Sequence, residues 1–325
     1  MRKLWVLLPL ILTACGPVAV EQPAPQPTQI NYFEQEIDWE QCGDYECADI
    51  LAPLDWEFPE FDSISLSLLR LNNPDSDRVV FLNPGGPGVS ATQWMRDRGA
   101  GIATQSVINN FDLVTFDPRG VGESTAVSCP DPKLKDELLY GQADSSAQSQ
   151  KLIAAYVENC QQNSGAILEY VGTRNAARDL ELIRSLLSLE KVNFIGYSYG
   201  TELAATYLAL FPERVGRFVL DGAVDPTIGS RQATINQLQG FDQAFETYLL
   251  DCLDNECPLG TDLSTAKATV SSLIESVSES PVEVGPREVT SSALVTGIIA
   301  ALYQQSAWAI LTDAFADLLA EDGGR

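Results

Sequence analysis

Residues 192–204 read Val-Asn-Phe-Ile-Gly-Tyr-Ser-Tyr-Gly-Thr-Glu-Leu-Ala, and this stretch decides the fold. It predicts a short apolar strand that ends at Ile195, a tight turn, and a helix that begins after Gly200. A serine between two glycines at such a turn exposes its hydroxyl, which can then attack a substrate. We therefore predict that Ser198 is a nucleophile. Gly196 and Gly200 are predicted as turn residues, because side chains there would collide with the neighbouring strand and helix.

The same chain contains no histidine. A serine hydroxyl is a weak nucleophile near neutral pH and needs a base within hydrogen-bond reach, which at a turn of this kind is a histidine further along the sequence. Either the sequence stops before its catalytic residues are complete, or the protein is not a hydrolase in the ordinary sense. In both cases we expect the 325 residues alone to hydrolyse substrates feebly at most.

Apolar runs and helical periodicities alternate around the serine. Strands are predicted at residues 47–56, 63–71, 79–82, 111–116, 192–195 and 215–220. Helices are predicted at residues 146–162 and 173–189, and in the second one Ala176, Leu180, Ile183 and Leu187 recur at helical spacing. Strands that alternate with helices indicate an α/β fold with a mostly parallel sheet covered on both faces.

The pattern changes towards the C-terminus. Helices are predicted at residues 232–253, 262–279, 289–304 and 307–320, with no buried strand between them. We interpret residues 229–325 as a helical lid over the strand ends, where ligands bind in such folds. Residues 31–228 then form the core of the fold.

The loop Asn83-Pro84-Gly85-Gly86-Pro87-Gly88 follows an early strand. Acyl transfer needs backbone N–H groups that point at the oxyanion of a tetrahedral intermediate, and glycines let a backbone approach closely. We predict that one such donor is the N–H of Gly86 and that the other is the N–H of Tyr199, the residue after the serine.

Two further loops carry charged residues. Asp117 and Arg119 follow the strand at 111–116, and we expect an ion pair between them to lock that loop. Asp221 and Asp225 follow the next strand after the serine, where some catalytic triads place their acid. Since the acid of a triad orients a histidine, and this chain has none, we interpret both as loop-shaping residues.

These motifs together resemble one known family. The Asn83 loop, Asp117-Pro118-Arg119-Gly120-Val121-Gly122-Glu123-Ser124, the helix from Thr173 to Arg184 with Asp179, Gly196-Tyr197-Ser198-Tyr199-Gly200-Thr201, and Leu220-Asp221-Gly222-Ala223-Val224-Asp225-Pro226 occur in the order found in the tripeptidyl aminopeptidases. Those proteins are exported α/β-hydrolases similar to proline iminopeptidases.

The resemblance implies an α/β-hydrolase fold and a serine exopeptidase that removes short peptides from free N-termini. In that family the triad acid and histidine lie beyond the lid, so we expect the sequence to be incomplete at its C-terminus and its sheet to lack the last core strands. Selection of a free N-terminus needs a carboxylate that pairs with the substrate ammonium. Glu246, Asp251 and Glu256 of the lid are available for this role.

The N-terminus predicts export. Residues 1–14 combine a basic start with a short apolar run, which is typical of a signal peptide and too short to span a bilayer. The ending Leu12-Thr13-Ala14-Cys15 resembles a bacterial lipobox and implies a lipid on Cys15. Residues 15–30 contain four prolines and predict an extended tether, so we expect a cell-envelope lipoprotein held at a membrane.

Composition limits the classes of partner that the protein can bind and indicates the redox state of its cysteines. The formal charge of −25 argues against binding to nucleic acid, which is itself a polyanion. We expect no metal or other cofactor, since the chain has no histidine and no Cys-x-x-Cys. Apart from Cys15, an even number of cysteines remains in a chain predicted to be exported, which suggests disulfides. Sequence proximity favours the pairs Cys42–Cys47, Cys129–Cys160 and Cys252–Cys257.

Three functional hypotheses stay open at this point. The first is a cell-envelope serine aminopeptidase whose sequence continues past residue 325. The second is a peptide-binding lipoprotein that kept the cleft and lost catalysis. The third is a carboxylesterase with the same serine turn.

Overall fold

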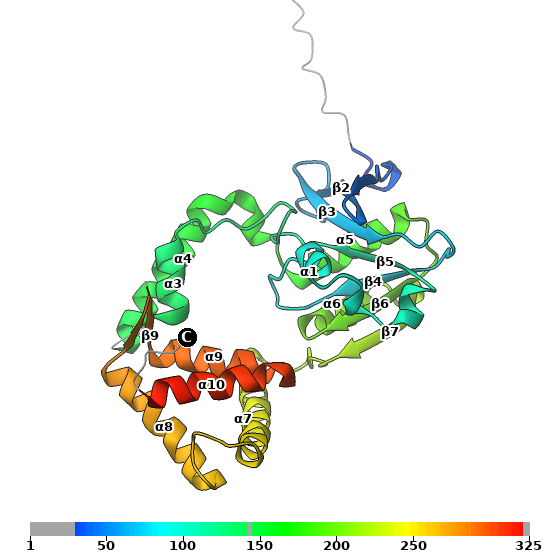
Figure 1. Ribbon diagram of the computed structural model, residues 1–325. Coiled ribbons are helices and arrows are strands. Elements are labelled where there is room, and N and C mark those ends of the chain that lie inside the picture. The colour runs from blue at the N-terminus through cyan, green and yellow to red at the C-terminus, as the bar shows by residue number, and fades with distance from the viewer. Residues whose placement is uncertain (1–29, 142–144, 286, 321–325) are drawn as a thin grey trace, which may run out of the picture. The chain divides into compact units, whose positions relative to one another are not determined.

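The computed structural model describes residues 30–141, 145–285 and 287–320 (Figure 1). All the elements named below belong to one compact unit, Tyr32–Arg325. The predicted signal peptide and Cys15 lie outside the described residues, as does the predicted tether apart from Ile30. Each helix in the described ranges is too short or too polar to cross a membrane.

One sheet is built from strands that lie between residues 40 and 221. Its strands are β1 (Glu40–Cys42), β2 (Tyr45–Pro53), β3 (Ser63–Leu71), β4 (Val79–Asn83), β5 (Asp112–Phe116), β6 (Val192–Tyr197) and β7 (Val215–Asp221). They lie in the order β1-β2-β3-β5-β4-β6-β7. Strands β5, β4, β6 and β7 are parallel, whereas β1, β2 and β3 pair antiparallel with one another and β3 pairs antiparallel with β5. The predicted α/β sheet is confirmed, and β1 was not predicted.

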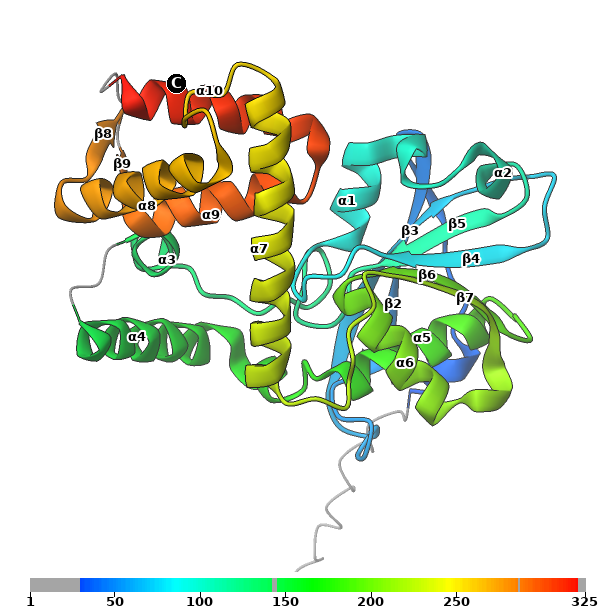
Figure 2. The same cartoon turned by 90° about the horizontal axis from the view of Figure 1, so that it is seen from below.

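Helices cover both faces of this sheet (Figure 2). On one face lie α5 (Thr173–Leu186) and α6 (Tyr199–Leu210), and on the other lie α1 (Ala91–Arg98) and α2 (Gln105–Ile108). The predicted apolar stripe of α5 is confirmed, because its alanine, leucine and isoleucine pack in the core with strand residues such as Phe81 and Phe194. Every residue of β4 and β5 is buried, as expected for strands covered on both sides.

A second apolar core lies in the predicted lid. It is built by α7 (Ser230–Asp254), α8 (Leu263–Glu279), α9 (Ser291–Leu302) and α10 (Trp308–Leu319), with Tyr248 and Phe315 fully buried. The sequence did not reveal the short hairpin of β8 (Val282–Val284) and β9 (Arg287–Val289) between α8 and α9.

The excursion after β5 also reaches these helices. It contains α3 (Pro132–Tyr140), which was not predicted, and α4 (Ser146–Ser164), which was. Two hydroxyls at the start of α9, those of Thr290 and Ser292, donate hydrogen bonds to backbone carbonyl oxygens at the end of α3. Short 3₁₀ helices lie at Tyr32–Glu34, Gly99–Ile102, Gly165–Glu169, Pro212–Arg214 and Gln305–Ala307.

All three predicted cysteine pairs form disulfides among the described residues. Cys42–Cys47 and Cys252–Cys257 each close a short loop with a sequence separation of 5, and Cys129–Cys160 joins the start of the excursion to α4 with a separation of 31. The last pair therefore fixes the base of the α3–α4 excursion.

Candidate active site

Ser198 occupies a strained turn between β6 and α6. Its backbone has φ 51° and ψ −120°, a region that residues with a side chain rarely adopt. Neighbouring hydrogen bonds hold this conformation. The Ser198 N–H donates to the carbonyl oxygen of Asp221 over 2.9 Å, and the Thr201 hydroxyl donates to the Ser198 carbonyl over 2.6 Å. The turn leaves the Ser198 side chain exposed at the end of the parallel strands.

Thr201 also links the turn to the loop after β7. Its hydroxyl oxygen accepts a hydrogen bond from the backbone N–H of Val224 over 2.9 Å, while its side chain is almost fully buried. Sequence reasoning missed this contribution, since a threonine in the first turn of a helix is common and its partner lies 23 residues away.

The contacts around the two glycines of the turn explain why neither position can carry a side chain. A Cβ added to Gly196 would lie 2.6 Å from the carbonyl oxygen of Gly200. A Cβ added to Gly200 would lie 2.7 Å from the carbonyl oxygen of Asn83, on the neighbouring strand. Real Cβ atoms do not approach oxygen so closely, so the packing of β6, β4 and α6 demands glycine at both positions.

The glycine-rich loop after β4 lies directly against this turn. A Cβ on Gly85 would lie 2.4 Å from the carbonyl oxygen of Tyr197 and 3.1 Å from the Cβ of Ser198. The buried side chain of Asn83 shapes the loop, because its Oδ1 accepts a hydrogen bond from the Gly85 N–H over 3.0 Å. The structure thus brings the predicted oxyanion-donor residues, Gly86 and Tyr199, together with Ser198 in the wall of one cavity.

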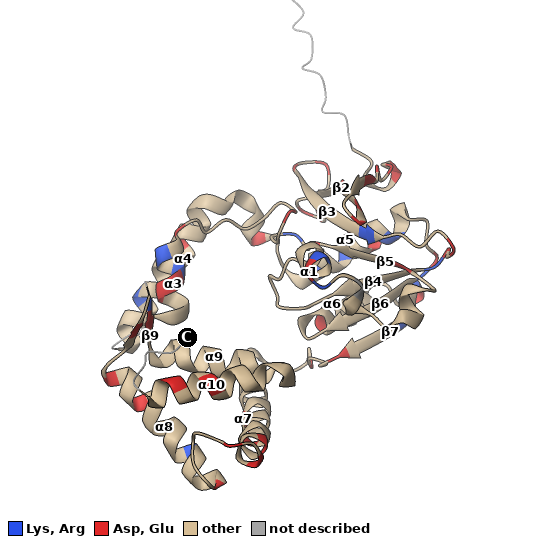
Figure 3. Ribbon diagram, viewed as in Figure 1, with Lys and Arg blue, Asp and Glu red and all other residues tan. Residues whose placement is uncertain are grey.

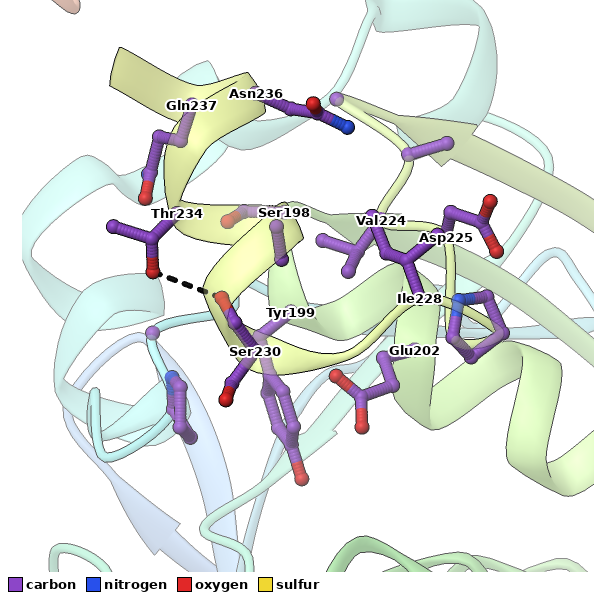
Figure 4. A pocket seen from close by; sticks show the side chains of 16 residues that line it. Ser198, Tyr199, Glu202, Val224, Asp225, Ile228, Ser230, Thr234, Asn236 and Gln237 are labelled. Atoms are coloured by element: carbon purple, nitrogen blue, oxygen red, sulfur yellow. Dashed lines mark hydrogen bonds between the residues drawn. The ribbon is translucent and has the colours of Figure 1, made fainter.

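This cavity has a volume of about 750 Å³ (Figure 4). Its walls come from the glycine-rich loop, the start of α6, the loop after β7 and the first turns of α7. The lining residues are Gly86, Pro87, Ser198, Tyr199, Glu202, Gly222, Ala223, Val224, Asp225, Pro226, Ile228, Ser230, Ala233, Thr234, Asn236 and Gln237. The polar residues of α7 were not predicted as site residues, because periodicity shows that a helix is present but not which face meets a cavity.

Two carboxylates, Glu202 and Asp225, line the cavity, and no lysine or arginine is among the described residues that line it. Asp225 accepts hydrogen bonds from the backbone N–H and the hydroxyl of Thr227, which hold the pKa of its carboxyl below the usual range. These bonds agree with the interpretation of Asp225 as a loop-shaping residue. Glu202 is half-buried, and among the described residues its carboxylate has no hydrogen-bond or ion-pair partner.

A smaller cavity of about 320 Å³ lies beside the first one. Pro87 and Tyr199 line both cavities, so they form the shared wall. The rest of the smaller cavity is largely apolar and includes four valines. The Tyr199 hydroxyl is hydrogen-bonded to the hydroxyl of Thr173 over 2.9 Å, and burial raises the pKa of this phenol.

The predicted ion pair between Asp117 and Arg119 is wrong. Arg119 instead forms a bidentate ion pair with Asp179 of α5, with N–O distances of 2.6 and 2.7 Å. Asp117 accepts hydrogen bonds from Ser90 and Thr92 at the start of α1. The sequence suggested a local pair because the two residues are close, but the fold brings Asp179, 60 residues further along the chain, to the Arg119 guanidinium.

The lid carboxylates predicted to bind an ammonium lie outside the lining of the serine cavity. Glu246 pairs with Lys267 over 2.8 Å, and neither Asp251 nor Glu256 lines the cavity. Within the ranges that the structure describes, no group of three or more Cys, Asp or Glu side chains is arranged to hold a metal ion.

Comparisons with known proteins place the chain in a family. The model of the alpha/beta hydrolase fold family matches residues 78–297, and the chain belongs to that family. It is 33% identical over 322 residues to serine protease Hip1 of Mycobacterium tuberculosis, and 34% identical over 314 residues to tripeptidyl aminopeptidase of Streptomyces lividans. It is 31% identical over 301 residues to carboxylesterase B of Mycobacterium tuberculosis.

These matches cover 88–89% of the present chain but only 57–61% of the relatives. The chain therefore spans about three-fifths of the length of the curated relatives it matches. The names of the relatives include both a peptidase and an esterase, so they leave the substrate class to the chemistry of the site.

Proposed function

We propose that the protein is a serine peptidase that releases short peptides from the free N-termini of its substrates. The observation that carries this proposal is the strained Ser198 turn, against which the glycine-rich loop packs at the edge of a cavity of about 750 Å³. A relative named tripeptidyl aminopeptidase and one named serine protease support the choice of a peptide substrate.

The proposed chemistry is acyl transfer. The Ser198 oxygen attacks the carbonyl carbon of the scissile peptide bond, and the N–H groups of Gly86 and Tyr199 donate hydrogen bonds to the oxyanion that forms. The attack needs a base that accepts the hydroxyl proton and then gives it to the nitrogen of the leaving amine as the C–N bond breaks. Water then hydrolyses the ester bond to Ser198 and releases the acyl group. The 325 residues contain no histidine, so we propose that this base lies outside them.

Two alternatives share the same cavity. A carboxylesterase would use the same serine and the same donors, and a relative with that name supports it. A peptide-binding protein without turnover would need the cavity alone. The acidic cavity lining favours a substrate that carries a positive charge, which a peptide with a free amine provides and a neutral ester does not.

We also propose that the protein is exported and attached to a membrane through a lipid on Cys15. The sequence of residues 1–15 supports this proposal. Mass spectrometry of the N-terminal peptide isolated from producing cells tests it, with a diacylated Cys15 as the expected N-terminal residue.

The activity can be tested on protein isolated from the cells that produce it. We expect hydrolysis of tripeptidyl p-nitroanilides with a free amine, little hydrolysis of the N-acetylated forms, and loss of both with Ser198→Ala. Preferred hydrolysis of p-nitrophenyl esters over the anilides would instead identify a carboxylesterase. Peptide binding without any turnover would identify the binding protein.

A further inference from the structure

We propose that Glu202 is the residue that binds the α-ammonium group of the peptide substrate. The inference deepens the proposed peptidase function and rests on it, since it assigns the selection of a free N-terminus to one side chain of the α/β core. It also replaces the expectation that a carboxylate of the helical lid has this role.

The position of Glu202 relative to Ser198 suits a short acyl group. Both residues line the same cavity, and Glu202 lies in the first turn of α6, four positions after the serine (Figure 4). Four residues of α-helix rise by about 6 Å, and an extended peptide advances by about 3.3–3.6 Å per residue. A peptide with its scissile carbonyl at Ser198 can therefore reach the carboxylate with its N-terminus after a short stretch of chain.

The carboxylate of Glu202 is available to a ligand. Among the described residues no lysine, arginine, hydroxyl or backbone N–H is bonded to it, although its side chain is half-buried. Its negative charge contributes to the raised pKa of Tyr199, which agrees with a place beside that ring in the cavity wall. A bound ammonium would supply the missing partner in a setting partly shielded from water, where charge-assisted hydrogen bonds are strong.

The other carboxylates are less suited to this role. Asp225 also lines the cavity, but its oxygens already accept two hydrogen bonds from Thr227. Glu246 is paired with Lys267, and neither it nor Asp251 belongs to the cavity wall. Acidic residues occur on many elements of the protein (Figure 3), so net charge alone does not select a binding residue. Glu202 lines the serine cavity, and its carboxylate has no bonding partner among the described residues. For these two reasons we assign the binding of the ammonium group to Glu202.

Calorimetric titration tests the proposal without depending on turnover. Protein isolated from producing cells and carrying Ser198→Ala is titrated with trialanine and with N-acetyl-trialanine. We expect tighter binding of the free peptide. Adding Glu202→Gln, which keeps the shape and removes the charge, should weaken binding of the free peptide by about 10- to 100-fold. It should leave the acetylated peptide unchanged, so the preference for a free N-terminus disappears.

A matched variant separates a direct contact from a loss of charge. Glu246→Gln makes the same change outside the cavity, and we expect it to change the affinity less than threefold. A Glu202→Gln variant that keeps the wild-type preference for the free peptide would overturn the assignment, as would an equal effect from Glu246→Gln. Tight binding of N-acetyl-Lys-Ala-Ala that depends on Glu202 would also overturn it, because the carboxylate would then take a basic side chain.

The same titrations distinguish this inference from the proposed function. If neither trialanine nor its acetylated form binds, the peptidase proposal fails and the role of Glu202 fails with it. If trialanine binds better than its acetylated form but Glu202→Gln has no effect, only the role of Glu202 is refuted.

Discussion

The ion pair of Arg119 and Asp179 connects the loop after β5 to helix α5 inside the protein. Both side chains have 0% exposure, and the guanidinium also donates to the carbonyl oxygens of Pro53 and Leu54. The Trp56 indole N–H donates to Asp179 as well, over 3.0 Å. Replacing Asp179 by asparagine removes the charge with little change in volume and leaves a buried, uncompensated guanidinium.

The cost of breaking such a pair can be stated in advance. Removing one partner of a fully buried ion pair destabilises a protein by about 3–5 kcal/mol. Asp136→Asn is the matched control, because Asp136 also pairs with an arginine, Arg287, but their side chains are 53% and 67% exposed. Exposed pairs contribute less than about 1 kcal/mol, so this control should be close to wild type.

Urea unfolding followed by circular dichroism measures both variants. With a denaturant slope of about 3 kcal/mol per molar, Asp179→Asn should lower the unfolding midpoint by about 1 M or more, and Asp136→Asn by about 0.3 M at most. Equal midpoints for the two variants would refute the reasoning, because burial would then not determine the cost of losing the carboxylate.

Three further predictions concern packing, disulfides and pH. Gly200→Ala should destabilise the fold by about 1–3 kcal/mol and abolish activity in the anilide assay, because the added Cβ would lie 2.7 Å from the carbonyl oxygen of Asn83. A fully active variant would contradict this. Cys160→Ser should cost about 1.5 kcal/mol more in unfolding free energy than Cys257→Ser, because its bridge spans 31 residues rather than 5; equal melting temperatures would contradict that order. Burial, with a hydrogen bond to Glu181, raises the pKa of Tyr207 in the folded state, so stability should fall as pH rises above about 10, the value in the unfolded chain. Tyr207→Phe should show a smaller fall between pH 9 and about 11, and a fall as steep as that of the wild type would argue against the assignment.

The serine turn was predictable because its requirements are local. Two glycines, an apolar strand and a helix start within 13 residues fix the conformation of Ser198, and the structure has the serine at positive φ as that turn requires. Strand β4 was predictable for a related reason, since it begins with a run of four apolar residues. Strand β5 is shorter in apolar content, with Leu113, Val114 and Phe116, but these were enough to indicate a strand. Helices α7 to α10 followed from their periodicity.

The partners of buried charges were not predictable in the same way. Arg119 meets Asp179 across 60 residues of sequence, and no spacing rule connects a loop residue with a helix residue at that distance. The hairpin of β8 and β9 was missed because strands of three residues carry too little pattern. The lining of the serine cavity by Thr234 and Gln237 depends on how α7 lies against the core, which only the folded chain determines.

The central claim is that Ser198 is the nucleophile of a serine hydrolase. A fluorophosphonate probe forms a covalent bond with an activated serine, and intact-mass spectrometry of protein isolated from producing cells detects the adduct. We predict a single adduct that peptide mapping places on Ser198 and that Ser198→Ala abolishes. An adduct that persists in Ser198→Ala, or no adduct on the wild-type protein, would contradict the claim.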